Sequence, residues 1–166
     1  MKENVIATKE DKIEKILGEL LTERKLTIST AESCTGGELG KLITSNPGSS
    51  KYYLGGIIAY ATDKKTKLLN VSQQTIDQFS VVSEQVAEEM ALGCQNVFDT
   101  DIALSTTGVA GPGKGEDGND VGTVYYSIRI KDRTETYKLF LPHLDRTDFT
   151  YFVSQKVIQD LVSLLV

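Results

Sequence analysis

The stretch Thr30-Ala31-Glu32-Ser33-Cys34-Thr35-Gly36-Gly37 marks the point in this 166-residue chain where a strand is expected to turn into a helix. Leu26-Thr27-Ile28-Ser29 before it has the composition of a short buried strand. Glu38-Leu39-Gly40-Lys41-Leu42-Ile43 after it has apolar residues at helical spacing, so the last three residues of the stretch should form the helix N-terminus. A strand that leads directly into a helix is typical of α/β proteins.

This turn has the residues for chemistry as well as for folding. A helix N-terminus carries unpaired N–H groups and a partial positive charge, and Thr35, Gly36 and Gly37 would supply them here. Those groups could bind a phosphate, or stabilise an oxyanion formed when Ser33 or Cys34 attacks a carbonyl. The alternative is a tight turn in which the glycines only satisfy backbone geometry.

Composition places the chain among single-domain globular proteins. Hydrophobic residues make up 40% and charged residues 25%, and residues 1–166 fit one domain. No apolar run approaches the ~18 residues of a membrane span, and the N-terminus lacks the apolar core of a secretory signal, so we expect a cytoplasmic protein. The net charge of −5 gives no general attraction to nucleic acid or to an anionic membrane.

The residues that usually bind metals are scarce. Two cysteines, Cys34 and Cys94, are too few for a disulfide framework or a zinc cluster, and His143 is the only histidine. We therefore expect no metal and no cofactor. The sequence leaves open whether identical subunits assemble.

The remaining pattern alternates helices and strands and ends in a hairpin. This order predicts a three-layer α/β/α sandwich with a mixed sheet that includes a C-terminal antiparallel hairpin. The expected elements are helices at about 9–24, 83–98 and 146–165, a loop entering a short helix at 62–69, strands at 52–60 and 101–105, a glycine-rich loop at 107–118, and paired strands at 121–130 and 134–141. Residues 113–118 fit the GxGxxG pattern of dinucleotide-binding folds, but that pattern needs a following helix and a strand is expected here.

Ligands of α/β sheets bind at the carboxyl ends of the strands, where three segments of this chain should meet. They are residues 33–37, 60–65 and 105–112, which together supply hydroxyls, glycine N–H groups, a phenol and lysines, but no histidine. A serine nucleophile without histidine needs another base, and a desolvated lysine with a lowered pKa can replace it. Lys64 and Lys65 are the candidates, and the alternative is that both are ordinary surface lysines.

At these same segments the chain resembles the CinA C-terminal domain family. The shared motifs are Ala31–Gly37, the segment from Tyr60 to Lys65 followed by Leu68-Leu69-Asn70-Val71, Val82-Ser83-Glu84, and Thr107-Gly108-Val109-Ala110-Gly111-Pro112. The resemblance implies an α/β/α sandwich and the activity of the nicotinamide-nucleotide amidohydrolases (PncC-like enzymes). These enzymes convert nicotinamide mononucleotide to nicotinate mononucleotide and ammonia, a hydrolase reaction of pyridine nucleotide salvage and NAD metabolism.

The chain departs from the family pattern at a few positions that bear on substrate affinity. Many relatives have Ser-Gly where this chain has Thr107-Gly108, and Gly-Gly where it has Lys114-Gly115. The Asp145-Arg146 pair is kept, but a second arginine a few residues on is absent.

The resemblance also implies a role for each site residue. Ser33 attacks the carboxamide, Lys65 accepts its proton and later delivers one to ammonia, and Tyr60 orients that lysine or relays the proton. The substrate-binding residues would be Thr35, Gly36, Gly37, Thr107, Gly108 and Gly111, whose N–H groups stabilise the oxyanion or hold the ribose phosphate. The alternatives are a cysteine amidase that uses Cys34 and a non-catalytic module that binds a pyridine nucleotide.

Overall fold

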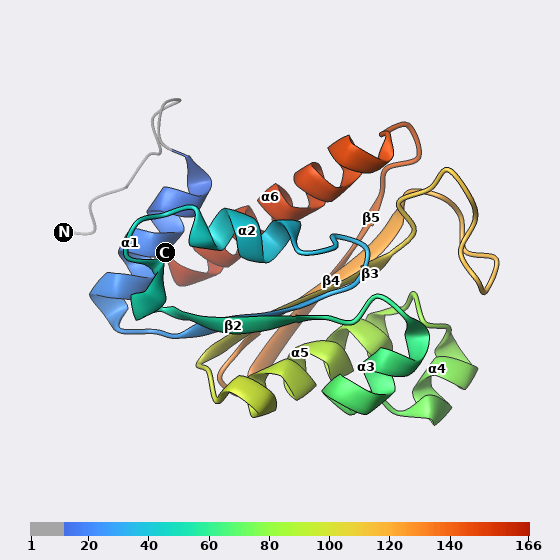
Figure 1. Cartoon of the computed structure of the whole chain (residues 1–166), viewed down its shortest axis with the longest axis horizontal. Coiled ribbons are helices and arrows are strands. Elements are labelled where there is room, and N and C mark those ends of the chain that lie inside the picture. The colour runs from blue at the N-terminus through green and yellow to red at the C-terminus, as the bar shows by residue number, and fades with distance from the viewer. Residues whose placement is uncertain (1–11) are drawn as a thin grey trace.

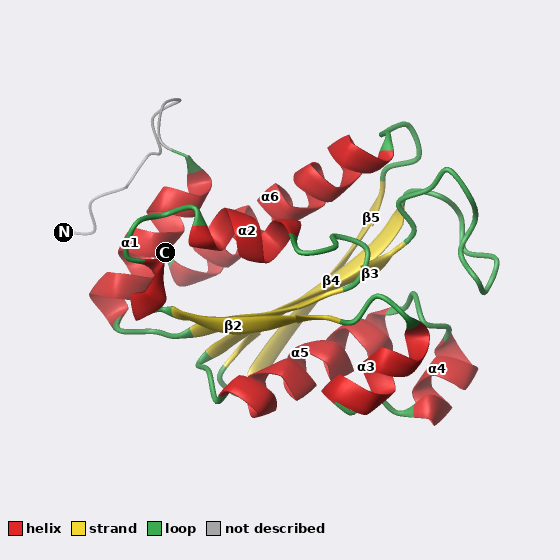
Figure 2. Ribbon diagram, in the orientation of Figure 1, coloured by secondary structure: helices red, strands yellow, loops and turns green. Residues whose placement is uncertain are grey.

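The computed structural model describes residues 12–166 and contains a five-stranded mixed sheet between two layers of helices (Figure 1, Figure 2). The strand order across the sheet is β2-β1-β3-β4-β5. β1 pairs in parallel with β2 and β3, whereas β3, β4 and β5 pair in antiparallel fashion. The strands are β1 (Ile28–Glu32), β2 (Tyr53–Ile58), β3 (Ile102–Gly108), β4 (Thr123–Ile130) and β5 (Arg133–Phe140). The predicted three-layer α/β fold with its C-terminal hairpin is confirmed.

Helices cover both faces of the sheet. One layer contains α1 (Ile13–Arg24), α2 (Glu38–Thr44) and α6 (Arg146–Leu165), and the other contains α3 (Thr62–Leu69), α4 (Gln73–Phe79) and α5 (Glu84–Phe98). A short 3-10 helix, Ser49–Lys51, precedes β2. Each layer has its own apolar core against the sheet, which explains why every residue of β1 is buried.

The parallel pairing of β1 with its two neighbours positions the site. Glu32 at the end of β1 lies opposite Ile58 of β2 and Thr106 of β3. The segments that leave these three strands therefore start from the same edge of the sheet. They are the turn into α2, the turn into α3 and the loop between β3 and β4.

Several boundaries differ from the sequence-based prediction for local reasons. β1 begins at Ile28 rather than Leu26, because the Leu26 amide donates to the Leu21 carbonyl (3.0 Å) and closes the end of α1. β3 extends to Gly108, so Thr107 and Gly108 belong to a strand rather than to the glycine-rich loop.

Two further differences concern the helices. α4 was not predicted, because it is short and only Ile76 among its residues is buried, which leaves a weak periodic signal. The first helix was expected from about residue 9, and residues 9–11 lie outside the described part of the chain. Across residues 12–166, we find no helix with the length and apolar character needed to cross a membrane.

Candidate active site

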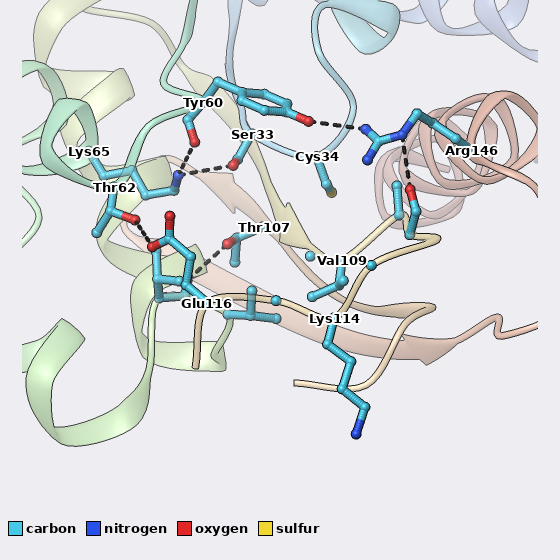
Figure 3. A pocket seen from close by; sticks show the side chains of 17 residues that line it. Ser33, Cys34, Tyr60, Thr62, Lys65, Thr107, Val109, Lys114, Glu116 and Arg146 are labelled. Carbon is cyan, nitrogen blue, oxygen red and sulfur yellow. Dashed lines mark hydrogen bonds between the residues drawn. The ribbon is translucent and has the colours of Figure 1, made fainter. Parts of the chain in front are cut away.

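A pocket of about 300 Å³ opens at the carboxyl ends of the parallel strands. Its wall includes Ser33 after β1, Lys65 on α3, Thr107 on β3, Glu116 in the loop between β3 and β4, and Arg146 at the start of α6 (Figure 3). The segments singled out in the sequence thus meet at one place.

Ser33 and Lys65 are in direct contact in this pocket. Lys65 Nζ lies 2.9 Å from Ser33 Oγ, and it also donates to the backbone carbonyls of Ala59 (2.8 Å) and Tyr60 (3.3 Å). The side chain of Lys65 is only 2% exposed. This burial disfavours the ammonium form and lowers the pKa of Lys65 to about 8. A buried amine beside a hydroxyl is the arrangement that a serine–lysine hydrolase needs.

The neighbouring lysine has the opposite environment. Lys64 has a 48% exposed side chain and forms an ion pair with Asp63 at 3.2 Å. Successive residues of a helix point about 100° apart, so α3 can direct only one of the two lysines toward Ser33. The structure directs Lys65 there.

The N-terminus of α2 is occupied by a side chain of the protein itself. The Glu32 carboxylate accepts hydrogen bonds from the amides of Gly37 (3.2 Å), Leu39 (2.9 Å) and Gly40 (3.0 Å), and from Thr35 Oγ1 (2.7 Å). Glu32 is 2% exposed, so its charge balances the positive helix end inside the protein.

This contact changes the expected set of substrate-binding residues. Thr35, Gly36 and Gly37 do not line the pocket. Of the amides that the sequence suggested for a phosphate or an oxyanion, that of Gly37 donates to Glu32 and that of Gly36 donates to the Ser33 carbonyl at 3.1 Å. Thr107, Gly108 and Gly111 do line it. The hydroxyl of Thr107 donates to the Val81 carbonyl at 2.9 Å, which ties β3 to the segment before α5.

Cys34 lies in the pocket wall, but its environment opposes ionisation. Burial raises the pKa of the Cys34 thiol to about 12, and the nearby charge of Glu32 acts in the same direction. Since a cysteine nucleophile reacts as the thiolate, this environment argues against the cysteine-amidase alternative.

Tyr60 contributes through its backbone rather than through its phenol. Its carbonyl accepts a hydrogen bond from Lys65, whereas its hydroxyl accepts one from Arg146 Nη1 at 3.0 Å. The side chain is 59% exposed and extends toward α6 (Figure 3). The phenol therefore does not contact Lys65, and the expected proton relay through it does not match this geometry.

Sequence reasoning did not assign two charged residues of the pocket. Arg146 Nε donates to the Gly111 carbonyl at 3.0 Å, and Glu116 accepts a hydrogen bond from Thr62 Oγ1 at 3.1 Å. The Asp-Arg pair at 145–146 was a signal for the first of them. Nothing local marks Glu116, because its partner on α3 is far away in the sequence. In the part of the chain that the structure describes, no three His, Cys, Asp or Glu side chains gather in a way that could hold a metal ion.

Fold and site together define an α/β/α protein with a buried serine–lysine pair at the strand ends. The family model for the CinA C-terminal domain matches residues 10–165, and the chain belongs to this family. A CinA-like protein of Flavobacterium psychrophilum is 54% identical over 125 residues, which cover 75% of this chain and 30% of that protein. A CinA-like protein of Gloeothece citriformis is 50% identical over 72% of this chain and 28% of its own length. The chain thus spans less than a third of the length of these curated relatives.

Solved structures match over nearly their whole length. A competence or damage-inducible protein from Enterobacter asburiae has a TM-score of 0.90 and 31% identity, with 93% of this chain and 96% of that one covered. A CinA superfamily protein from Enterobacter cloacae has a TM-score of 0.91 and 30% identity, with 100% and 99% covered. The resemblance noted in the sequence is confirmed.

Proposed function

We propose that this pocket hydrolyses the carboxamide of nicotinamide mononucleotide to nicotinate mononucleotide and ammonia. The observation that supports the reaction class is the 2.9 Å contact between the buried Lys65 Nζ and Ser33 Oγ. We infer the substrate from the family resemblance, because the members of that family with amidohydrolase activity act on this nucleotide.

The contacts of Lys65 suit a base that works as a neutral amine. A neutral amine has two N–H groups, which the carbonyls of Ala59 and Tyr60 can accept, and one lone pair, which is then left for the Ser33 hydroxyl. With a pKa of about 8, roughly a tenth of the lysine is neutral at pH 7. For an exposed lysine with the usual pKa, the neutral fraction at pH 7 would be less than about a hundredth of that value.

The proposed reaction has two halves. Ser33 Oγ bonds to the carboxamide carbon while its proton passes to Lys65, and the C–N bond then breaks as Lys65 returns that proton to the departing nitrogen as ammonia. A water molecule next attacks the resulting ester, gives a proton to Lys65 and releases the carboxylic acid. Ser33 recovers its proton from Lys65, so the enzyme ends as it began.

The negative charges of substrate and intermediate need separate partners. The Glu32 carboxylate already accepts hydrogen bonds from amides at the N-terminus of α2. We therefore assign the oxyanion to the backbone around Thr107 and Gly108, which lines the pocket beside Ser33. We assign the ribose phosphate to Arg146 and the glycine-rich loop near Gly111, because a guanidinium offers several donors to phosphate oxygens.

Ammonia release from purified protein tests this function. The substrates are nicotinamide mononucleotide, nicotinamide and glutamine, and the variants are Ser33→Ala and the matched Cys34→Ala. We expect release from the mononucleotide, a loss of at least ~10³-fold in Ser33→Ala, and a change within about tenfold in Cys34→Ala.

Two outcomes would contradict the proposal. An active Ser33→Ala beside a folded but inactive Cys34→Ala would favour the cysteine amidase. Tight binding of the mononucleotide by the wild-type protein without any ammonia release would favour the non-catalytic binding module.

A further inference from the structure

Glu116 reaches the pocket from the loop between β3 and β4 and lies beside the candidate catalytic lysine (Figure 3). Its Oε2 atom accepts a hydrogen bond from Thr62 Oγ1 at 3.1 Å. Thr62 is the first residue of α3, and Lys65 follows three positions later on the same side of that helix. The carboxylate therefore stands on the face of α3 that points to Ser33.

The other oxygen of this carboxylate remains available. Among residues 12–166, Oε1 of Glu116 has no hydrogen-bond partner. Lys114 also lines the pocket, but its Nζ atom points away from Glu116 (Figure 3) and lies 3.9 Å from Asp120 Oδ1, so this lysine does not neutralise Glu116. The Arg146 guanidinium donates its hydrogen bonds to the Gly111 carbonyl and the Tyr60 hydroxyl rather than to Glu116.

The loop that carries Glu116 is fixed by the next residue along the chain. The Asp117 carboxylate accepts hydrogen bonds from Ser80 Oγ (2.6 Å) and from the Val81 amide (2.9 Å). Asn119 Nδ2 donates to the same Ser80 hydroxyl at 2.8 Å. Asp117 holds the loop in place and does not line the pocket, whereas Glu116 does line it. Glu116 is therefore placed to interact with a ligand rather than only to hold the loop.

Resting on the proposed function, we infer that Glu116 selects the uncharged carboxamide substrate over the carboxylate product. When a carboxamide carbon lies against Ser33, its N–H₂ group can donate to the free oxygen of Glu116. The acid formed by hydrolysis presents a carboxylate at the same place, which has no proton to donate and is repelled by the like charge. Glu116 thus holds the amide before reaction and disfavours the product after it.

The size of the effect follows from exposure. Glu116 is an exposed residue and its charge also interacts with the charge of Lys65, so water, salt and this lysine weaken the repulsion. We therefore expect a preference of about tenfold rather than one of several orders of magnitude. A glutamine at this position would keep an oxygen that accepts the amide N–H, and would add an N–H₂ group that can donate to the acid.

Binding measured by titration calorimetry in the Ser33→Ala background, where turnover is blocked, tests the inference. The ligands are nicotinamide mononucleotide and nicotinate mononucleotide, and the added substitutions are Glu116→Gln and, as the matched control, Asp120→Asn, which removes a charge from the same loop at an exposed position outside the pocket. We expect the Ser33→Ala protein to bind the amide about tenfold more tightly than the acid. Glu116→Gln should remove that preference, mainly through tighter binding of the acid, and Asp120→Asn should preserve it.

The possible results separate this inference from the proposed function. An unchanged preference in Glu116→Gln, or an equal loss in Asp120→Asn, would overturn the selective role of Glu116 while the amidohydrolase proposal stands. Failure of both nucleotides to bind would overturn the substrate class and this inference with it.

Discussion

Burial distinguishes the two adjacent lysines of α3 more than any motif does. Lys65 is 2% exposed and contacts Ser33, whereas the Lys64 side chain is 48% exposed and pairs with Asp63. The cost of burying an ammonium lowers the pKa of Lys65 to about 8, close to the pH at which a base is useful. The same residue type thus supplies a base at one position and a solvated charge at the next.

Activity should depend on Lys65 and not on Lys64. Lys65→Met removes the base but keeps an apolar chain of similar length, and we expect it to reduce deamidation by at least ~10³-fold. Lys64→Met should stay within about threefold, because an exposed ion pair contributes little. In the wild-type enzyme, kcat/KM should rise with pH and level off above about 8, as the amine loses its proton. A folded Lys65→Met enzyme of normal activity would overturn the role of this lysine.

The backbone amides at the N-terminus of α2 are hydrogen-bonded by a residue that precedes the helix in the sequence. Glu32 is the last residue of β1, and its carboxylate binds three amides of the α2 terminus together with the Thr35 hydroxyl. The turn that contains Ser33 lies between these contacts, so the same hydrogen bonds that stabilise α2 also fix the backbone beside the nucleophile.

Glu32→Gln should therefore destabilise the protein. Glutamine keeps one acceptor oxygen, and its N–H₂ group would face backbone N–H donors with nothing to accept. We expect a loss of about 2–4 kcal/mol in the free energy of unfolding, measured by urea denaturation. Glu38→Gln is the control, since among residues 12–166 Glu38 pairs at 3.6 Å only with Lys41, whose side chain is 76% exposed, and we expect the substitution to change stability by less than about 1 kcal/mol. Equal stability of the two variants would show that the buried carboxylate is not needed.

The whole molecule assembles the pocket from segments spread along most of the chain. Ser33, Lys65, Thr107, Glu116 and Arg146 come together because three parallel strands end at one edge of the sheet and α6 begins beside it. A buried lysine at this edge has a consequence for the stability of the entire fold. The unfolded chain holds the Lys65 proton up to about pH 10.5, whereas the folded protein releases it near pH 8.

Stability should reflect this difference in proton binding. Between about pH 8 and 10.5 the unfolded chain binds more protons at Lys65, so this residue makes the free energy of unfolding rise with pH. Below pH 8 the folded protein contains a charged buried lysine, which costs about 3 kcal/mol at about 1.4 kcal/mol per pKa unit. Lys65→Met should therefore be more stable than wild type at pH 7, and its advantage should shrink toward pH 10.5.

Denaturation of both proteins across this pH range provides the measurement. Burial raises the thiol pKa of Cys94 as well, which lowers stability at high pH, but that effect is common to both proteins and cancels in the difference. The thiol of Cys34 interacts with the charge of Lys65, so the two proteins are compared in a Cys34→Ala background. A difference that does not vary with pH would mean that Lys65 has the same pKa in the folded and unfolded states.

The sequence by itself determined the class of fold and the segments of the site. Apolar periodicity and glycine positions are local properties, so they predicted the sandwich, the hairpin and the turn at Ser33, although they missed the short α4 and the true end of β3. The family motifs drew attention to Ser33 and Lys65 before their contact was known.

Only the tertiary structure decided which groups face one another. It directed Lys65 rather than Lys64 to Ser33, filled the α2 end with Glu32, turned the Tyr60 phenol toward Arg146, and brought Glu116 to α3. Each of these outcomes depends on burial or on a contact between distant parts of the chain. Local patterns do not encode such contacts, because desolvation and charge act through space rather than along the sequence.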